Sequence, residues 1–371
     1  MTANVPAEVG MSVTEVDTPC LLVDLDALDR NIATLAAFAH EHHVRLRPHA
    51  KSHKSPDIAA RQIARGAVGL CCQTVSEAEA MVAGGARDVL VSNEVVAPRM
   101  IARLAALAKQ ARVLVCVDDA SSVTPLNEAA TAVGAPIDVL VEIDVGAGRC
   151  GIAPGAAACE LAGRIAGASH LRFTGLQAYH GPAQHLRDHA ARRATIDHAI
   201  ALTRDTVERL AARGLHCEIV AGAGTGSFDI EAVSGLYNEL QCGSYIFMDA
   251  DYARVRGVDG GALPFEHSLF LQTRVISKTR PGRAVCDAGL KSHSVDSGLP
   301  VVFDYDDIRY TGASDEHGQL DDPHDHLALG DTLRLVPGHC DPTVNLHDWL
   351  VACRDDRVVA LWPVAARGMS R

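Results

Sequence analysis

The feature that most constrains the fold is a repeated alternation of short apolar runs with alanine-rich amphipathic segments. A strand-like run over residues 20–25 and a helical segment over residues 26–43 come first. Eight further apolar runs then begin near Val44, Ala67, Asp88, Arg112, Ile137, Leu171, His216 and Leu240. Eight strand–helix units in about 220 residues predict a closed parallel (β/α)8 barrel. An open, doubly wound sheet is the alternative, because periodicity alone does not show closure.

The pattern changes from about residue 261 onward. Short strand-like runs, such as residues 268–277, 299–305 and 357–364, are separated by glycine, proline and aspartate turns without helical segments between them. We therefore predict an α/β chain with a barrel over residues 26–260 and a C-terminal all-β domain over residues 261–371. Residues 1–25 are expected to join the β domain, because their strand precedes the first barrel strand by a whole helix.

The amino-acid composition and net charge of the chain limit the classes of protein to which it could belong. The chain has 371 residues, of which 48% are hydrophobic, and a net charge of −12, which is typical of a folded acidic protein. The negative charge argues against nucleic acid or an anionic membrane as a partner. Eleven scattered cysteines, and a first stretch of twenty residues without the features of a secretory signal, lead us to expect a cytoplasmic enzyme with reduced thiols.

An unusual basic segment, VRLRPHAKSHKSP, occupies residues 44–56. In a strand, Arg47, His49 and Lys51 share one face, which points inward in a barrel. Lys51 would then lie near the C-terminal end of the barrel, where active sites are built. Partial desolvation would lower the pKa of its amine and suit it to form a Schiff base. The alternative is a basic strand end paired with acidic loops.

A glycine-rich turn follows the seventh predicted barrel strand, in EIVAGAGTGSF over residues 218–228. Glycines allow backbone N–H groups to converge on a phosphate, and the short helix expected from Asp229 adds a favourable dipole. This pattern predicts a phosphate site at Gly224, Thr225, Gly226 and Ser227. A tight strand–helix connection without a ligand is the alternative.

The segment PGHCDPTVNL, residues 337–346, contains a candidate metal pair. If the segment is extended, His339 and Asp341 share a face while Cys340 points away. An imidazole with a carboxylate suits Mn²⁺, Mg²⁺ or Co²⁺, whereas an imidazole with a thiolate would favour Zn²⁺. An ordinary loop histidine is the alternative.

Six segments in order resemble one known family. They are TPCLLVDLDALDRNI, RPHAKSHKSP, QTVSEAEAM, EIDVGAGRCGI, GLQAYHG and PGHCDPTVNL. Together they are similar to the D-threonine aldolase and D-serine dehydratase-like enzymes, which use pyridoxal 5′-phosphate (PLP) and have the alanine racemase fold type. The resemblance runs from about residue 17 to residue 364. It implies a barrel, a C-terminal β domain, bound PLP, a divalent metal and a homodimer.

The resemblance also implies roles for individual residues. Lys51, rather than Lys54, would carry the cofactor, and Tyr179 would lie beside its pyridine ring as a neutral partner. Arg149 would reach the ring hydroxyl or the substrate carboxylate. The remaining cofactor contacts implied by the family are Gln73 at a strand end and, for the phosphate, Ser244 and Tyr245.

The metal pair indicates which reaction to expect. D-serine dehydratases of this family resemble His-x-Cys, whereas D-threonine aldolases resemble His-x-Asp, and this chain has His339 and Asp341. By the same resemblance His185 is the base for the β-hydroxyl, with His180 as a nearer but less well-matched candidate. We therefore expect a PLP- and divalent-metal-dependent aldolase that cleaves D-threonine to glycine and acetaldehyde, with Mn²⁺ as the first choice of metal.

Other functions stay open on the sequence alone. A 3-hydroxy-D-aspartate aldolase fits every motif, although an extra substrate carboxylate would need an arginine or lysine that the sequence does not single out. A D-serine or D-3-hydroxyaspartate dehydratase would give a 2-oxo acid and ammonia. A non-catalytic PLP-binding protein is the alternative from a different class, and the β domain argues against it. Residues 314–318 (SDEHG) are a further polar segment expected near the site.

Overall fold

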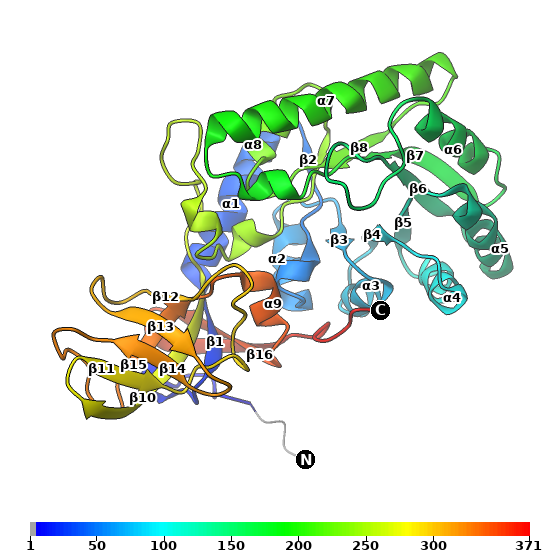
Figure 1. The fold of residues 1–371 in the computed structure, drawn as a ribbon. Helices are drawn as coiled ribbons and strands as arrows, with labels where there is room; N and C mark the ends of the chain where they lie inside the picture. Colours follow the sequence, from blue (N-terminus) through cyan, green and yellow to red (C-terminus); the bar gives the residue numbers. More distant parts are fainter. Residues whose placement is uncertain (1–4) are drawn as a thin grey trace.

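The computed structural model describes residues 5–371, and within them eight parallel strands form the first of two sheets (Figure 1). The strands are β2 (Arg45–Leu46), β3 (Leu70–Cys72), β4 (Asp88–Glu94), β5 (Arg112–Val117), β6 (Ile137–Glu142), β7 (Leu171–Gln177), β8 (Ile219–Gly222) and β9 (Glu239–Leu240). Their order is β2-β9-β8-β7-β6-β5-β4-β3. All eight runs expected from the sequence are therefore strands of one sheet.

The two outer strands of this order meet and close the barrel. A parallel bridge joins His49, beyond β2, to Cys71 in β3. The N–H of Cys71 donates to the carbonyl of Pro48 at 2.9 Å, and the N–H of Val68 donates to the carbonyl of Leu46 at 2.8 Å. These contacts select the closed barrel over the open sheet.

Helices follow the strands and lie around the barrel (Figure 1). They are α1 (Leu25–Glu41), α2 (Pro56–Ala64), α3 (Val75–Ala83), α4 (Pro98–Leu107), α5 (Val123–Val133), α6 (Ala156–Ala166), α7 (His189–Ala212) and α8 (Phe228–Ala232). Short polar side chains begin several of them, since Asp24, Thr74 and Asp188 each accept backbone N–H groups of the first turn. No helix within residues 5–371 has the length and apolarity to cross a membrane.

A buried ion pair fills the N-terminal end of the barrel. The guanidinium of Arg47 is 1% exposed, and its Nε lies 2.7 Å from Oε1 of Glu239, which is fully buried. Its Nη1 lies 2.5 Å from Oδ1 of Asp88. Above this layer the barrel interior is apolar, with Leu90 and Leu114 among the residues packed there. The site is therefore confined to the opposite end of the barrel, where the strands finish.

The second sheet contains nine strands within the same described range and forms the lower part of Figure 1. They are β1 (Cys20–Asp24), β10 (Leu269–Arg280), β11 (Arg283–Cys286), β12 (Val301–Val302), β13 (Arg309–Ala313), β14 (Gly318–Asp321), β15 (Thr332–Val336), β16 (Trp349–Arg354) and β17 (Arg357–Pro363). Strand β1 lies between β10, to which it is antiparallel, and β16, to which it is parallel. The N-terminal strand thus belongs to this sheet, while residues 1–4 lie outside the described part of the chain.

The barrel and the second sheet pack on one continuous apolar core, which includes Leu28 of α1, Phe247 and Leu350 of β16. The side-chain amide of Asn31 donates to the carbonyls of Ile246 and Glu266, which fixes the chain where it leaves the barrel. The short helix α9 (Cys340–Val344) extends from the second sheet toward the barrel and contacts the segment that holds Lys51. This packing brings residues of both parts to one site.

Candidate active site

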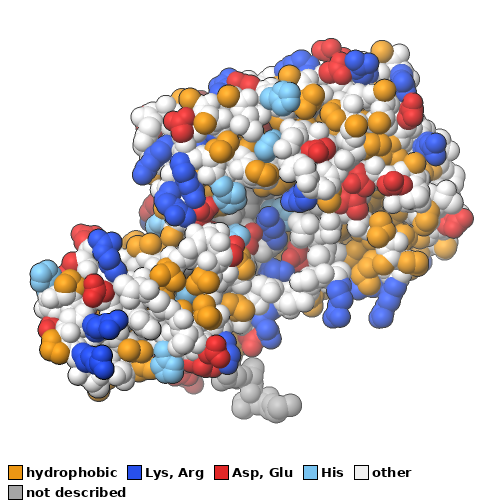
Figure 2. Space-filling model, viewed as in Figure 1, with side chains coloured by type: hydrophobic (Ala, Val, Ile, Leu, Met, Phe, Trp, Pro, Cys, Tyr) orange, Lys and Arg blue, Asp and Glu red, His pale blue; other side chains and the backbone are white. Residues whose placement is uncertain are grey.

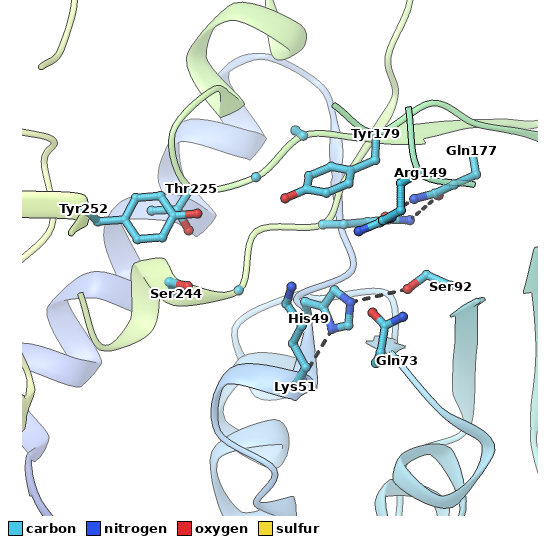
Figure 3. A pocket seen from close by; sticks show the side chains of 14 residues that line it. His49, Lys51, Gln73, Ser92, Arg149, Gln177, Tyr179, Thr225, Ser244 and Tyr252 are labelled. Carbon is cyan, nitrogen blue, oxygen red and sulfur yellow. Dashed lines mark hydrogen bonds between the residues drawn. The ribbon is translucent and has the colours of Figure 1, made fainter. Parts of the chain in front are cut away.

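A cavity lies at the C-terminal ends of the barrel strands (Figure 3). Figure 2 shows a hollow between the barrel and the second sheet, with basic and acidic side chains in it. The cavity is lined by His49, Lys51, Gln73, Ser92, Arg149, Gln177, Tyr179, Ala223, Gly224, Thr225, Gln241, Gly243, Ser244 and Tyr252.

The structure separates the two lysines of the basic segment. Lys51, in a short 3-10 helix after β2, points into the cavity with its side chain 36% exposed, and its Nζ lies 3.8 Å from Oδ2 of Asp341. Lys54 is buried, and its Nζ lies 2.5 Å from Oε1 of Glu77. The other oxygen of Glu77 accepts the N–H of Gln73 at 2.7 Å. Lys54 therefore fixes the loop that carries Gln73, and Lys51 is the amine that a ligand can reach.

The pKa of Lys51 differs from the expectation. Burial is the largest influence and lowers the pKa of its amine, but Asp341, with smaller contributions from Tyr179 and Cys71, raises it, and the net shift is upward. Asp341 lies 290 positions further along the chain, and a pattern around Lys51 could not reveal it. In the unliganded protein this amine is therefore protonated and paired.

His49 lies beneath Lys51 and was placed on the inward face by the strand pattern. Its Nδ1 accepts the N–H of Lys51 at 3.4 Å, and its Nε2 lies 3.3 Å from the hydroxyl of Ser92 (Figure 3). Burial holds the pKa of His49 well below its usual value. The ring is therefore neutral and forms a fixed floor for the cavity.

Arg149 and Tyr179 lie side by side at the cavity (Figure 3). The guanidinium carbon of Arg149 lies 5.7 Å from the centre of the Tyr179 ring, and its Nη2 lies 3.9 Å from Oε1 of Glu142. Burial raises the pKa of Tyr179, so its phenol stays neutral. Burial and the neighbouring Glu94 raise the pKa of Glu142 to about 8. The two predicted ring contacts thus lie on the same cavity wall.

The glycine-rich turn after β8 contributes Gly224 and Thr225 to the lining. A Cβ on Gly224 would lie 2.5 Å from the amide oxygen of Gln184, and one on Gly243 would lie 2.7 Å from the hydroxyl of Ser52. Both glycines therefore pack against the wall behind them while their backbone faces the cavity. This backbone cradle, with the hydroxyls of Thr225 and Ser244, suits a phosphate group.

Three of the predicted phosphate contacts lie behind this cradle and do not line the cavity. The N–H of Gly226 donates to Oε1 of Gln184 at 3.0 Å. The hydroxyl of Ser227 donates to Oε2 of Glu231 at 2.6 Å and is fully buried. The hydroxyl of Tyr245 accepts a hydrogen bond from Gln62 at 3.0 Å, whereas its backbone N–H donates to Thr225. The N–H of Gly226, the hydroxyl of Ser227 and the N–H of Tyr245 thus donate to groups of the protein itself.

His185 and His180 have different surroundings. His185 is half-exposed; its Nδ1 lies 2.6 Å from Oδ2 of Asp251, and its ring centre lies 5.7 Å from that of Tyr252, which lines the cavity. His180 is buried, its Nδ1 accepts the N–H of Ala183 at 3.2 Å, and burial lowers its pKa. Neither ring lines the cavity. Nε2 of neither ring makes a hydrogen bond within residues 5–371, and His185 is the more exposed of the two.

The segment expected to be extended around His339 is partly helical. His339 is extended and precedes α9, whereas Asp341 lies in the first turn of that helix. Oδ1 of Asp341 accepts a hydrogen bond from Ser244 at 3.4 Å, and Cys340 between the two residues is fully buried. Pro342 in the first helical turn is a sequence signal for this helix start that the alternation argument overlooked.

The donor set at His339 and Asp341 fits a divalent cation. Burial would lower the pKa of His339, but Asp341 and Asp296 outweigh it and raise the pKa. Burial would raise the pKa of Asp341, but Lys51 and His339 outweigh it and lower the pKa. Nδ1 of His339 lies 2.8 Å from Oδ2 of Asp296, which leaves Nε2 for an ion. A metal-binding histidine is commonly held by a carboxylate in this way.

A second group of possible ligands was not expected from the sequence. Atoms of Glu94, Asp118 and Cys150 lie within 4.8 Å of one another, near the ends of β4 and β5. Burial and Glu94 raise the pKa of the Cys150 thiol to about 11, so it is protonated at neutral pH. A protonated thiol is a poor metal ligand, and this group is less suited to an ion than His339 with Asp341.

Sequence reasoning missed several residues that line the cavity. Gln177 and Gln241 exchange two hydrogen bonds, of 2.7 and 2.9 Å, across the ends of β7 and β9. A polar residue at the end of an apolar strand is the signal that could have found them. Residues 314–317, in contrast, form an exposed turn between β13 and β14, and Gly318 is the buried first residue of β14; Asp315 lies 3.9 Å from Lys291 and does not line the cavity.

Comparisons with known proteins agree with this architecture. Residues 23–251 match the family model described as alanine racemase, N-terminal domain, and residues 268–353 match the putative serine dehydratase domain. A 3-hydroxy-D-aspartate aldolase from Paracoccus denitrificans (strain Pd 1222) is 50% identical over 370 residues, covering 98% of this chain and 96% of the relative. A D-threonine aldolase from an Arthrobacter species is 45% identical over 368 residues, covering 99% and 97%.

Among solved structures, D-threonine aldolase from Filomicrobium marinum has a TM-score of 0.97 and 50% identity, covering 99% of this chain and all of that one. The chain therefore belongs to the family with the alanine racemase N-terminal domain. Within that family it is a PLP-dependent aldolase, a carbon–carbon lyase of the D-threonine aldolase type. The expected family, fold and enzyme class are confirmed.

Proposed function

We propose that this protein cleaves D-3-hydroxy-amino acids by a retro-aldol reaction and that D-threonine is converted to glycine and acetaldehyde. The observation that carries the proposal is the approach of Lys51 Nζ to Asp341 at 3.8 Å, in a cavity at the mouth of the barrel. The amine of a barrel residue and the carboxylate of a residue that follows strand β15 of the second sheet thereby meet beside one cavity.

We assign a separate role in binding the cofactor to each of several residues in and behind the cavity lining. PLP, when bound, withdraws electrons from the α-carbon of the substrate. Lys51 would hold the cofactor through its amine and would supply the proton that the α-carbon takes up. Tyr179 and Arg149 orient the ring, and the neutral phenol of Tyr179 avoids placing a charge beside it. The backbone of the glycine-rich turn, with Thr225 and Ser244, binds the phosphate, while Gly226, Ser227 and Tyr245 support the turn from behind. Gln73 completes the lining on the side of β3.

His339 and Asp341 are proposed to hold a divalent ion, Mn²⁺ first and Mg²⁺ or Co²⁺ as alternatives. Such an ion supplies Lewis acidity for a substrate hydroxyl. His185 is proposed to remove the proton of the β-hydroxyl through Nε2, because its Nδ1 is already engaged by Asp251. The exposed Nε2 and the position of the ring near Tyr252 suit that task better than the buried ring of His180.

We further propose a domain organisation, an oligomeric state and a cellular location for the enzyme. The barrel over residues 26–260 and the β domain over residues 1–25 and 261–371 act as two domains, with the metal pair on the second. The enzyme works as a cytoplasmic homodimer on small amino acids, without nucleic acid or membrane partners. The negative net charge of −12 supports the absence of polyanionic partners.

A second candidate substrate is 3-hydroxy-D-aspartate, which would give glycine and glyoxylate. Two relatives at 50% and 48% identity carry the name 3-hydroxy-D-aspartate aldolase. All the contacts proposed above serve this substrate equally. Dehydration is the less favoured alternative, because the ligand after His339 and Cys340 is the carboxylate of Asp341 rather than a thiolate.

Product analysis tests the proposal. The purified protein is incubated with PLP, Mn²⁺ and D-threonine, and acetaldehyde, glycine and 2-oxobutanoate are measured in the same sample. We expect equal amounts of acetaldehyde and glycine, lost with Lys51→Ala and with a chelator. Formation of 2-oxobutanoate would replace the aldolase by a dehydratase. Glyoxylate from 3-hydroxy-D-aspartate, without acetaldehyde from D-threonine, would keep the reaction and change the substrate.

A further inference from the structure

A short acidic segment after β9, residues 249–251, contacts both halves of the proposed site. The side chain of Asp251 is only 7% exposed, and three positively charged or protonatable side chains contact its carboxylate. Its Oδ2 lies 2.6 Å from Nδ1 of His185, and its Oδ1 accepts hydrogen bonds from Arg187 and from Arg254, the latter at 2.7 Å. These contacts hold the carboxylate in one position against the histidine ring.

The charge state of Asp251 decides which nitrogen of His185 carries the proton. Burial would raise the pKa of Asp251, but Arg187 and His185 outweigh it and lower the pKa to about 2. An ionised carboxylate only accepts hydrogen bonds, so Nδ1 of His185 must be the donor. The lone pair of the neutral ring then lies on Nε2, the nitrogen that makes no hydrogen bond in residues 5–371.

Asp249 connects this pair to the turn that carries the metal ligands. Its carboxylate is fully buried, and one oxygen accepts the N–H groups of Asp251 at 3.1 Å and Tyr252 at 2.9 Å. The other oxygen accepts the N–H of Cys340 at 2.9 Å. Cys340 lies between His339 and Asp341 in the chain.

A simple turn cap would explain only part of this arrangement. The N–H groups of Asp251 and Tyr252 donate to Asp249 at the start of the 3-10 helix that begins at Tyr252. Many aspartates accept such hydrogen bonds at the start of a turn. The bond to Cys340 spans 91 positions and joins the barrel segment to α9. The backbone N–H of Ala250 adds a second link across this boundary, since it donates to the carbonyl of Pro337 at 2.9 Å.

We propose that Asp251 and Asp249 are positioning residues of the aldol site. Asp251 fixes His185 with Nε2 as the proton acceptor, and Asp249 fixes that histidine relative to the turn of His339 and Asp341. The roles of His185 and the metal pair rest on the proposed function. The contacts of the two aspartates and the tautomer that they impose do not.

The first test uses Asp251→Asn and protein in which histidine is labelled with ¹⁵N. In the parent protein the His185 resonances, assigned by their loss in His185→Gln, should show a protonated Nδ1. The side-chain amide of asparagine can donate to Nδ1, so the variant should show a protonated Nε2 instead. With the base nitrogen blocked, kcat should fall by about 100-fold or more while KM changes little.

Asp205→Asn is the matched control, because Asp205 is an exposed aspartate that lies 2.6 Å from Arg209 on α7, outside the site. It should keep the tautomer of His185 and the kcat of the parent. An Asp251→Asn variant with Nδ1 still protonated, or with an unchanged kcat, would overturn the role given to Asp251.

The second test uses Asp249→Asn, whose amide nitrogen cannot accept an N–H. The asparagine oxygen keeps two of the three bonds when it accepts the N–H groups of Asp251 and Tyr252, so the bond from Cys340 is the one lost. We expect the tautomer of His185 to persist and the affinity for Mn²⁺, measured by electron paramagnetic resonance, to fall by about tenfold. An unchanged Mn²⁺ affinity would overturn the bridging role. Should Asp249→Asn fail to fold, Asp249→Ser is measured in the same way with the same two outcomes.

These measurements are distinct from the test of the reaction itself. A parent protein that forms no aldehyde from any D-3-hydroxy-amino acid would refute the proposed function. The tautomer of His185 and the Mn²⁺ affinity are read without turnover, so they still decide whether Asp251 and Asp249 position these groups.

Discussion

Replacing Arg47 by methionine should destabilise the barrel strongly. Arg47 is 1% exposed and its guanidinium makes two hydrogen bonds to Glu239, of 2.7 and 3.4 Å, and one to Asp88. Methionine fills a similar volume but leaves the fully buried carboxylate of Glu239 with Arg45 as its remaining cation, at 3.7 Å. Removing one partner of a buried pair costs about 3–5 kcal/mol in the free energy of unfolding.

The assay is equilibrium urea unfolding at pH 7, followed by the circular dichroism of the helices. The control is Arg193→Met, because Arg193 pairs with Asp197 on exposed α7 at 3.0 Å and that pair is about half exposed on both sides. Its loss should cost about 0.3–0.5 kcal/mol. The double variant Arg47→Met with Glu239→Leu should recover part of the lost stability, because it removes the unpaired charge. A loss below about 1 kcal/mol for Arg47→Met would refute the reasoning.

Three further predictions concern the site. The pKa of Asp251 is lowered to about 2, so its ionised carboxylate stabilises the folded protein above the ordinary pKa of 3.8, and this stabilisation is lost as the pH falls toward 2. The thermal unfolding temperatures of Asp251→Asn and the parent should therefore differ at pH 5 and converge at low pH. Ser227→Ala should cost about 1–3 kcal/mol in urea unfolding, because the buried Glu231 loses its donor, yet PLP affinity by absorbance titration should change little. A chelator should abolish aldehyde formation while the absorbance of bound PLP persists, and Mn²⁺ should restore activity.

Each of these has a contrary result. A stability difference for Asp251→Asn that grows as the pH falls would reverse the sign worked out above. A large loss of PLP affinity in Ser227→Ala would return that hydroxyl to the phosphate site. Full activity after exhaustive chelation would remove the metal from the reaction.

The barrel could be predicted well because its signals are local. Each strand from β2 to β9 is a short apolar run, and the alanine-rich segments between the runs have helical spacing. The place of β1 in the second sheet also followed, since a whole helix separates it from β2. Closure itself depends on the contact between residues near His49 and Cys71, which no periodicity shows.

The cavity lining was predictable where a residue follows the end of a strand. Lys51, Gln73, Arg149, Tyr179 and Gly224 all occupy such positions, and all line the cavity. The strands of a parallel barrel end on the same face, which indicated where these side chains would meet, while the choice of Gln73, Arg149 and Tyr179 rested on the family resemblance.

Hydrogen-bond and charge partners that the apolar periodicity does not indicate explain what the sequence could not show. Asp341 raises the pKa of Lys51 from a position far along the chain, where local reasoning expected a lowered value. Glu231 and Gln62 take the hydroxyls of Ser227 and Tyr245 away from the cavity. In each case the side chain interacts with another polar group that the fold places beside it. The spacing of residues in the sequence does not indicate which group that is.

The central claim is that Lys51 carries the cofactor in the cavity that it lines, beside Asp341, and one measurement tests it most directly. The protein is loaded with PLP and reduced with borohydride, which traps the bond between the amine and the cofactor, and is then digested for peptide mass spectrometry. The account predicts the cofactor mass on Lys51 and none on Lys54, which the buried Glu77 holds. Cofactor on Lys54, or on no residue of this segment, would contradict it.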